Sequence, residues 1–223
     1  MKYFKSYIFI FLAAVFFPEC KKDSVSSNLA SVNITNAITG GAILKYGANS
    51  STIANNSYVQ FKVGGGSNNI YVYAATDSLH PYFNQTMDLE NGGVYSLFLL
   101  GGLSAAIEGL LIKDTIPFQS DSTAGVRFVN LSSNSNLLNV SLSTTPTVME
   151  VSNLGYKQYT SFKTYPAKSS NANYIFQIRK ASDNSILTTY TLSTPRFANV
   201  TLVIRGVVGT TPALGITRVN NDR

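Results

Sequence analysis

The residue with the most distinctive chemistry in this 223-residue chain is Cys20, its only cysteine. The first six positions hold two lysines and no acid, and an apolar run over residues 7–17 follows them. A basic start followed by a short apolar run is typical of a secretory signal peptide. A permanent membrane span needs about 20 apolar residues, more than this run contains. A single thiol forms no disulfide within the chain, so its position at the end of the leader makes Cys20 a candidate acyl acceptor.

The residues around Cys20 resemble the lipobox of bacterial lipoproteins, in which the cysteine is acylated and becomes the first mature residue. Phe17-Pro18-Glu19-Cys20 precedes Lys21-Lys22-Asp23-Ser24, which is similar to the start of outer-membrane lipoproteins of Gram-negative bacteria. The pattern normally has a small residue where Glu19 stands and an aliphatic one where Phe17 stands. The resemblance implies a signal peptide over residues 1–19, a lipid anchor at Cys20, a tether over residues 20–27 and location at the outer membrane, on either face. Acyl chains at ~0.8 kcal/mol per buried CH₂ would make this anchor effectively permanent.

Groups for catalysis are sparse in the remainder of the chain. His80 is the only histidine and stands before Pro81, which favours an exposed turn and offers no metal-ligand spacing. Asp88 and Glu90 could share one face of a strand, as the paired carboxylates of a glycosidase do, but the following Asn91-Gly92-Gly93 favours a solvated turn. We therefore predict that the protein is not an enzyme and that it needs no metal or cofactor.

The charge of the chain is modest and scattered. The formal net charge is +6, and Lys21-Lys22 and Arg179-Lys180 are the only adjacent basic pairs. A nucleic-acid-binding protein gathers its basic residues on one face, so we expect no nucleic-acid partner. The expected partners are the membrane, through the anchor, and a glycan or a protein at the cell surface.

Aromatic residues crowd one segment near Lys157 and Lys163. They are Tyr156, Tyr159, Phe162 and Tyr165, of which Tyr156 and Tyr165 are the candidate ligand contacts. Tyrosine is enriched at interfaces. The alternative, which we favour, is core packing, because Tyr159 and Phe162 recur in the first half as Tyr58 and Phe61 and half-buried strands favour aromatic residues.

Four short motifs of Asp followed by Ser or Thr resemble the O-glycosylation acceptors of exported bacterial proteins. The resemblance implies glycan attachment at Ser24, Ser78, Thr115 and Ser122. Thr115 and Ser122 are the first and last residues of a segment, residues 115–122, whose Pro, Ser and Asp are typical of an exposed linker. Glycans there would stiffen and shield that linker.

The composition and periodicity predict an all-β protein. Only 13% of residues are charged, and strand-forming residues alternate with period two between Gly- and Asn-rich turns. In one strand, Val126, Phe128 and Asn130 alternate with Arg127 and Val129, which places the first set on a core face. The apolar stretch over residues 94–112 is interrupted by Gly101-Gly102, so it predicts two strands joined by a turn and not a membrane helix.

The strand patterns of the second half repeat those of the first at a nearly constant spacing. Residues 58–62 match 159–163, Ile70 and Val72 match Phe176 and Ile178, and residues 95–101 match 200–206. A shared order of elements indicates two similar domains. We predict two tandem immunoglobulin-like or transthyretin-like β-sandwiches, over residues 28–114 and 123–223, joined by the linker.

The second half contains residues that resemble the opening of DUF4397 domains. These are Val126-Arg127-Phe128-Val129-Asn130-Leu131-Ser132 and Leu138-Asn139-Val140-Ser141-Leu142, with Ser133 and Asn139 where the family usually has Pro and Asp. The resemblance implies a β-sandwich of unknown function found in secreted and lipid-anchored bacterial proteins. We expect a non-enzymatic cell-envelope lipoprotein that serves as a binding, adhesion or spacer module. The alternatives are a carbohydrate-binding lipoprotein of a glycan-uptake system and a fimbrial or pilus subunit.

Overall fold

The computed structural model describes residues 28–103 and 106–221. The first half of these residues folds into eight strands in two four-stranded sheets, ordered β4-β1-β7-β8 and β3-β2-β5-β6. The strands are β1 (Leu29–Asn36), β2 (Leu44–Tyr46), β3 (Thr52–Ile53), β4 (Tyr58–Gly64), β5 (Gly66–Ala74), β6 (Asp77–Leu89), β7 (Val94–Leu100) and β8 (Glu108–Lys113).

The second half repeats this architecture with eight further strands, ordered β12-β9-β15-β16 and β11-β10-β13-β14. They are β9 (Thr123–Asn130), β10 (Leu138–Leu142), β11 (Thr145–Leu154), β12 (Lys163–Pro166), β13 (Asn173–Lys180), β14 (Ile186–Ser193), β15 (Asn199–Arg205) and β16 (Gly215–Asn221), with a short 3₁₀ turn at Ser169–Asn171. Strand for strand, the two orders are the same. The predicted all-β class with tandem sandwiches is confirmed.

The first strand of each repeat lies inside its sheet. Strand β1 pairs antiparallel with β4 and parallel with β7, with Ile34 opposite Leu97. Strand β9 likewise pairs with β12 and β15, with Phe128 opposite Leu202. Strand β7 is followed by a hairpin to β8, as β15 is by a hairpin to β16. The stretch over residues 94–112 is therefore two strands, as predicted. Among the described residues, no helix is long and apolar enough to cross a membrane.

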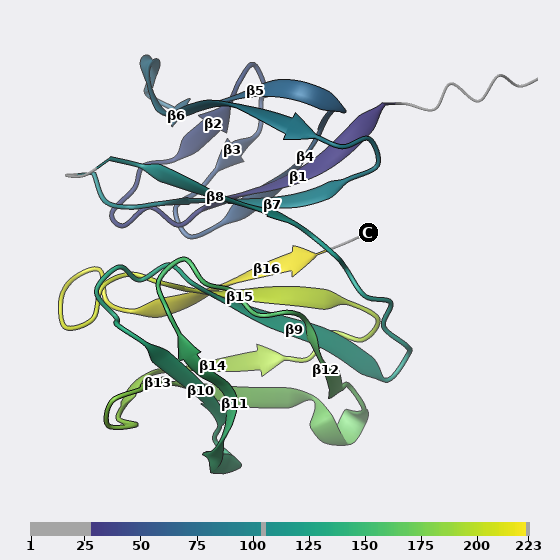
Figure 1. The fold of residues 1–223 in the computed structure, drawn as a ribbon, viewed down its shortest axis with the longest axis vertical. Helices are drawn as coiled ribbons and strands as arrows, with labels where there is room; N and C mark the ends of the chain where they lie inside the picture. Colours follow the sequence, from purple (N-terminus) through teal and green to yellow (C-terminus); the bar gives the residue numbers. More distant parts are fainter. Residues whose placement is uncertain (1–27, 104–105, 222–223) are drawn as a thin grey trace, which may run out of the picture.

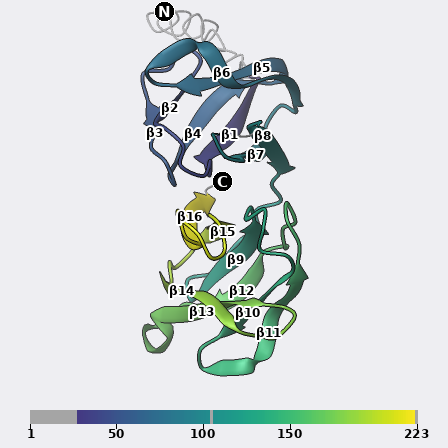
Figure 2. The ribbon, with the colours of Figure 1, turned by 90° about the vertical axis from the view of Figure 1, so that its left-hand side faces the viewer.

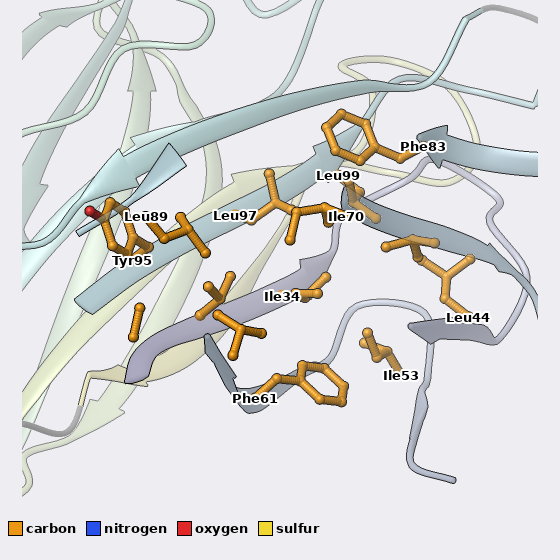
Figure 3. Packing of buried hydrophobic residues seen from close by; sticks show 14 of the residues in the cluster. Ile34, Leu44, Ile53, Phe61, Ile70, Phe83, Leu89, Tyr95, Leu97 and Leu99 are labelled. Atoms are coloured by element: carbon orange, nitrogen blue, oxygen red, sulfur yellow. The ribbon is translucent and has the colours of Figure 1, made fainter. Parts of the chain in front are cut away.

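Each sandwich has its own core, built from the alternation of its strands. In β5, Ile70, Val72 and Ala74 point inward, where they are fully or almost fully buried. Figure 3 shows Ile70 packed among Leu44, Phe83 and Leu99 from other strands of the first sandwich. The equivalent residues of β13, Phe176 and Ile178, are buried in the second core, where Phe176 meets Phe128 edge to face with ring centroids 5.2 Å apart. The predicted repeat of these core positions is confirmed.

At two further pairs of equivalent positions, both repeats have the same residue type because the backbone around it requires that residue. Asn36 and Asn130, each the last residue of its first strand, are both fully buried. Their amides donate to the carbonyls of Ile53 and Leu154, respectively, and so tie the end of each first strand to the end of β3 or β11. Gly101 and Gly206 follow β7 and β15 with φ of +111° and +90°. A Cβ at Gly206 would lie 2.3 Å from the carbonyl oxygen of Ala213, so glycine is required there.

The two sandwiches stack on each other to give four layers of sheet. Figure 1 shows the first sandwich, in purple to teal, above the second, in green to yellow, and Figure 2 shows the same order from the side. The sheet that contains β1 and β7 faces the sheet that contains β9 and β15. The connection over residues 115–122 lies against this junction, because Ile116 and Gln119 are buried and Gln119 donates to Asn199. The linker that the sequence predicts to be exposed is therefore only partly exposed.

Candidate functional site

The two sandwiches contact each other through a third cluster of buried hydrophobic side chains, separate from the two sandwich cores. Its side chains are contributed by both repeats. From the first sandwich come Ala37, Phe98, Leu100 and Ile112, and from the second Val129, Leu131, Val203 and Val219. Side chains that point away from each sandwich core thus form a third, shared core.

A buried ion pair lies at one end of this contact. The Nη1 atom of Arg127 on β9 lies 2.7 Å from Oδ1 of Asp114, which follows β8, and the two side chains are only 4% and 1% exposed. The guanidinium also donates from Nε to Thr201 Oγ1 at 2.7 Å and from Nη2 to Ser96 Oγ at 3.0 Å. Ser96 in turn donates to Asp114 Oδ2 at 2.7 Å. Both charges are therefore paired and hydrogen-bonded, as buried charges must be.

Two more side chains complete this cluster. The hydroxyl of Thr201 donates to Asn221 Oδ1 at 2.6 Å, which ties strand β16 to the pair. The ring of Phe162 covers the Arg127 guanidinium, with 4.7 Å from the carbon Cζ to the ring centroid. A cation held against an aromatic face away from water gains about 2 kcal/mol or more. The arrangement joins the end of β8 to three strands of the second sandwich.

Neutral contacts join the sandwiches at other positions along the same sheets. Asn33 of β1 donates to the carbonyl of Asn220 at 3.0 Å. Thr217 of β16 donates across the junction to the carbonyl of Asn56 at 3.4 Å. Within its own sandwich, the Thr217 hydroxyl accepts a hydrogen bond from Arg205 Nε at 2.9 Å. Burial lowers the pKa of Arg205 below its usual value. These bonds and the Arg127 cluster connect the two sandwiches at separate positions along their facing sheets.

One exposed ion pair also bridges the repeats beside the aromatic segment. Lys157 pairs with Glu108 of β8 and lies 5.2 Å from the centroid of the Tyr156 ring. The hydrogen bond to Glu108 raises the pKa of Lys157. Tyr156 itself is half-buried against the shared core, and this burial raises the pKa of its hydroxyl. Tyr156 thus packs at the domain junction.

The second candidate ligand contact, Tyr165, lies in the core of the second sandwich. It is 5% exposed, and its hydroxyl donates to Glu150 Oε2 at 2.8 Å. Burial, followed by this bond to a carboxylate, raises the pKa of Tyr165 far above its usual value. Its ring packs against Tyr174 and Phe176, so Tyr165 is a residue of the second core, which argues against a role as a ligand contact.

The other two aromatic residues of the segment do not occupy core positions. Tyr159 is 50% exposed and lies beside an open surface hollow of about 340 Å³ that is also lined by Phe162, Lys113 and Thr115. The expectation that Tyr159 and Phe162 are core residues is wrong for both, because Tyr159 is half exposed and Phe162 lies on the outer face against Arg127, whereas Phe61 is in the first core.

The other titratable candidates that the structure describes lie at exposed positions of the first sandwich. His80 lies at the exposed β5–β6 tip, with Nδ1 2.9 Å from Asp77 Oδ2. Its hydrogen bond, followed by that of the Leu79 amide, lowers the pKa of Asp77. Glu90 pairs with Lys113 at 2.5 Å and Asp88 is exposed. Within the part of the chain that the structure describes, no three His, Cys, Asp or Glu side chains gather as metal ligands.

The candidate modification sites differ in their surroundings. Cys20 and Ser24 lie outside the described residues. Ser78 is exposed at the β5–β6 tip. Thr115 is exposed too, but the Asp114 side chain of its motif is buried by Arg127. Ser122 is half-buried, and Asp121 of the same motif pairs with Arg196.

The shared core and the buried pair were missed from the sequence, although one signal points to them. Strand β7 is apolar on both faces except at Ser96, and six of its seven residues are buried; β9 and β15 are also buried along nearly their whole length, but Arg127 and Thr201 lie on their outward faces. A strand that is apolar on both faces must be covered on both faces. The alternation of β9 predicts that Arg127 faces outward, and in the structure the other sandwich covers that face.

Comparison with known proteins yields one family. The sequence profile described as Domain of unknown function (DUF4397) matches residues 30–141, which cover the first sandwich and strands β9 and β10 of the second. No curated protein matches the chain. The matched segment includes Val126 to Ser132 and half of the chain, and the protein belongs to the DUF4397 family.

Proposed function

We propose that the protein is a non-enzymatic lipoprotein of the cell envelope, anchored through Cys20, whose two sandwiches act as one rigid spacer and binding module. The observation that carries this proposal is the contact between the sandwiches. Domains in one chain move relative to each other unless their interface is large and hydrophobic. Here an apolar cluster from both repeats is closed by the buried Arg127–Asp114 pair.

The position of the first strand supports the spacer role. Leu29 begins β1 nine residues after Cys20, and nine residues span at most about 30 Å when extended. An anchor at Cys20 would hold the first sandwich close to the membrane. A rigid stack would then place the outer sheet of the second sandwich, β11-β10-β13-β14, beyond the first sandwich; Figure 2 shows that sheet at the end of the molecule opposite the first sandwich.

The fimbrial alternative requires a strand that one subunit donates to another. Strand β1 is paired on both sides in its own sheet. Removing it would break the first core, because Val32 and Ile34 belong to that core, and would not open a groove at a sheet edge. We therefore favour the spacer over the fimbrial subunit.

The single cysteine makes the rigidity directly measurable. In a Cys20→Ser background, new cysteines at the exposed Ser67 of β5 and Thr189 of β14 would carry spin labels on the two outermost sheets. One narrow distance distribution by pulsed electron resonance is expected. A broad distribution like that of two domains on a flexible linker would contradict the proposal.

The anchor is tested in the native host. The wild-type protein is expected in the membrane fraction with an acyl label, and the Cys20→Ser variant is expected as a soluble protein or an uncleaved precursor. A variant that still partitions with the membrane and still takes up the acyl label would overturn the anchoring claim.

A further inference from the structure

The outer face of the first sandwich carries two tyrosine rings held side by side. Tyr71 and Tyr73 are two residues apart on β5, so both point away from the core, and their ring centroids are 5.7 Å apart. The Tyr71 hydroxyl donates to the carbonyl of Ser78 at 2.6 Å, and the Tyr73 hydroxyl donates to the carbonyl of Gly47 at 3.0 Å. Both rings are therefore fixed before any partner arrives, which lowers the entropic cost of binding.

The fold itself does not require aromatic rings at these positions. In the second repeat, Gln177 and Arg179 of β13 alternate with the core residues Phe176 and Ile178, as Tyr71 and Tyr73 alternate with Ile70 and Val72. On the outer face of β13, Arg179 Nη2 donates a hydrogen bond to Gln177 Oε1 at 2.6 Å. Both β5 and β13 thus have an apolar inner face, but of the two only β5 has aromatic rings on its outer face.

The hairpin next to the rings is also elaborated in the first repeat. Tyr73 pairs with Pro81, but the next residue, Ala74, pairs with Asp77, so residues 78–80 form a bulge. In the second repeat the register of this hairpin shifts only once, between Ile178 and Arg179, and the Lys180 amide bonds to the Ser185 carbonyl across a four-residue turn. The bulge leaves the Leu79 residue 82% exposed and the His80 side chain 83% exposed. Bulges of this kind re-aim side chains beside functional sites.

The bulged tip faces away from the point where the chain enters the sandwich. The Gly92 amide, just after β6, donates to the Leu29 carbonyl at 2.8 Å, so the end of β6 lies beside the start of β1. Strand β6 has 13 residues, which place its other end about 40 Å away. Figure 1 shows the β5–β6 turn and the start of β1 at opposite ends of the sandwich. The tip is thus open to a partner outside the membrane.

The groups around the rings are mainly neutral; the charged side chains nearby are Lys45, which lies opposite Tyr73 on β2, and Asp77 at the tip, which pairs with His80. Asn84 lies opposite Tyr71, and Asn69 lies opposite Thr86 on the same face. All three of these polar side chains are exposed. Amide and hydroxyl groups offer donors and acceptors to hydroxyl groups of a ligand, and the faces of tyrosine rings pack against the apolar faces of sugar rings. Lys45 is a single cation and Asp77 is already paired with His80, so a charged ligand would find no cluster of counter-charges here.

We infer that this face, the Tyr71–Tyr73 platform with the bulge at residues 78–80, binds a neutral oligosaccharide. The inference deepens the proposed function, on which it rests, by giving the binding module a ligand class and a surface. It places the site on the first sandwich and not at Tyr156 or Tyr165.

The test uses the full mature chain in mild detergent and affinity electrophoresis in gels that contain dextran, mannan, laminarin or the acidic hyaluronan. The key variant, Tyr71→Gln with Tyr73→Arg, carries the residues of the second repeat, which that repeat accommodates. Tyr71→Phe keeps the ring and loses only the bond to Ser78. Tyr159→Ala removes an exposed ring elsewhere, and thermal unfolding reports whether each variant is folded.

At least one neutral polysaccharide is expected to retard the wild-type protein. The double variant should bind about tenfold or more weakly, whereas Tyr71→Phe and Tyr159→Ala should stay within a few-fold of wild type. Retardation by hyaluronan alone, no retardation by any neutral polysaccharide, or equal retardation of the double variant would each overturn the inference. None of these outcomes bears on the membrane anchor or on the rigidity of the stack, which the spin-label and fractionation experiments report separately.

Discussion

Arg127 on β9 and Asp114 at the end of β8 form an ion pair between the two sandwiches, with 2.7 Å between Nη1 and Oδ1. The sheet register makes Asn33 the counterpart of Arg127 in the first repeat, because each residue follows the core valine of its strand, Val32 or Val126. Asn33 makes a neutral bond to the Asn220 carbonyl. The two repeats thus face each other through equivalent sheets. Of the two equivalent positions, Arg127 forms an ion pair and Asn33 forms a neutral hydrogen bond.

Arg127→Met is expected to destabilise the protein by about 3–5 kcal/mol, because it leaves the Asp114 carboxylate buried without its cation. Urea unfolding monitored by circular dichroism measures this loss. The double variant Arg127→Met with Asp114→Leu removes both charges and should recover most of the stability. A single variant as stable as the wild type would show that the pair does not hold the junction.

Gly206→Ala is expected to cost more stability than Gly209→Ala. Both glycines have positive φ, +90° and +80°, so both substitutions carry a backbone penalty of about 1–3 kcal/mol. Only at Gly206 would the new Cβ also meet backbone, 2.3 Å from the Ala213 carbonyl oxygen, whereas it meets nothing within 4 Å at Gly209. Thermal unfolding of the two variants checks the difference, and equal melting temperatures would contradict it.

Glu150 should make the stability of the second sandwich depend on acid pH. Burial alone would raise the pKa of Glu150, but hydrogen bonds from Lys163 and Tyr165 outweigh burial and hold that pKa below its usual value. A lowered folded-state pKa gives stabilisation that is complete above the unfolded-state pKa and is lost as the pH falls through the folded-state pKa.

The measurement is the difference in unfolding free energy between the wild type and Glu150→Gln, followed from pH 7 toward pH 3. This difference is expected to shrink as the pH falls. Asp88→Asn, at an exposed position of β6, serves as the control and should differ little from wild type across the range. A wild-type advantage over Glu150→Gln that grows on acidification would contradict the assignment.

The candidate O-glycosylation sites should not be modified equally in the native host if the transferase acts on folded protein. Ser78 is expected to be modified, because its whole motif lies at an exposed tip, whereas the Asp114 side chain of the Thr115 motif is buried. Intact-mass measurement followed by peptide mapping checks this. A glycan at Thr115 would show that modification precedes folding, and the bare polypeptide mass would remove all four sites.

The register of one edge strand shows why the aromatic segment could not be assigned from the sequence. Phe61 lies opposite Val32 in the first repeat, whereas Lys163, not Phe162, lies opposite the equivalent Val126. A shift of one residue moves a side chain to the other face of a sheet. Phe162 therefore covers Arg127, and Tyr165 takes the core place that Val63 has in the first sandwich.

By itself, the sequence determined the all-β class, the repeat and the inward-facing residues such as Ile70 and Phe176, because alternation of period two is a local property of each strand. Only the tertiary structure decided which surface covers the outward faces. Phe98 on the doubly apolar strand β7 indicates that its outward face is covered, but not by what, and the outward faces of β9 and β15, which carry Arg127 and Thr201 beside Val203, give no such indication. That choice depends on contacts between residues far apart in the chain, and such contacts leave no period in the sequence of either strand.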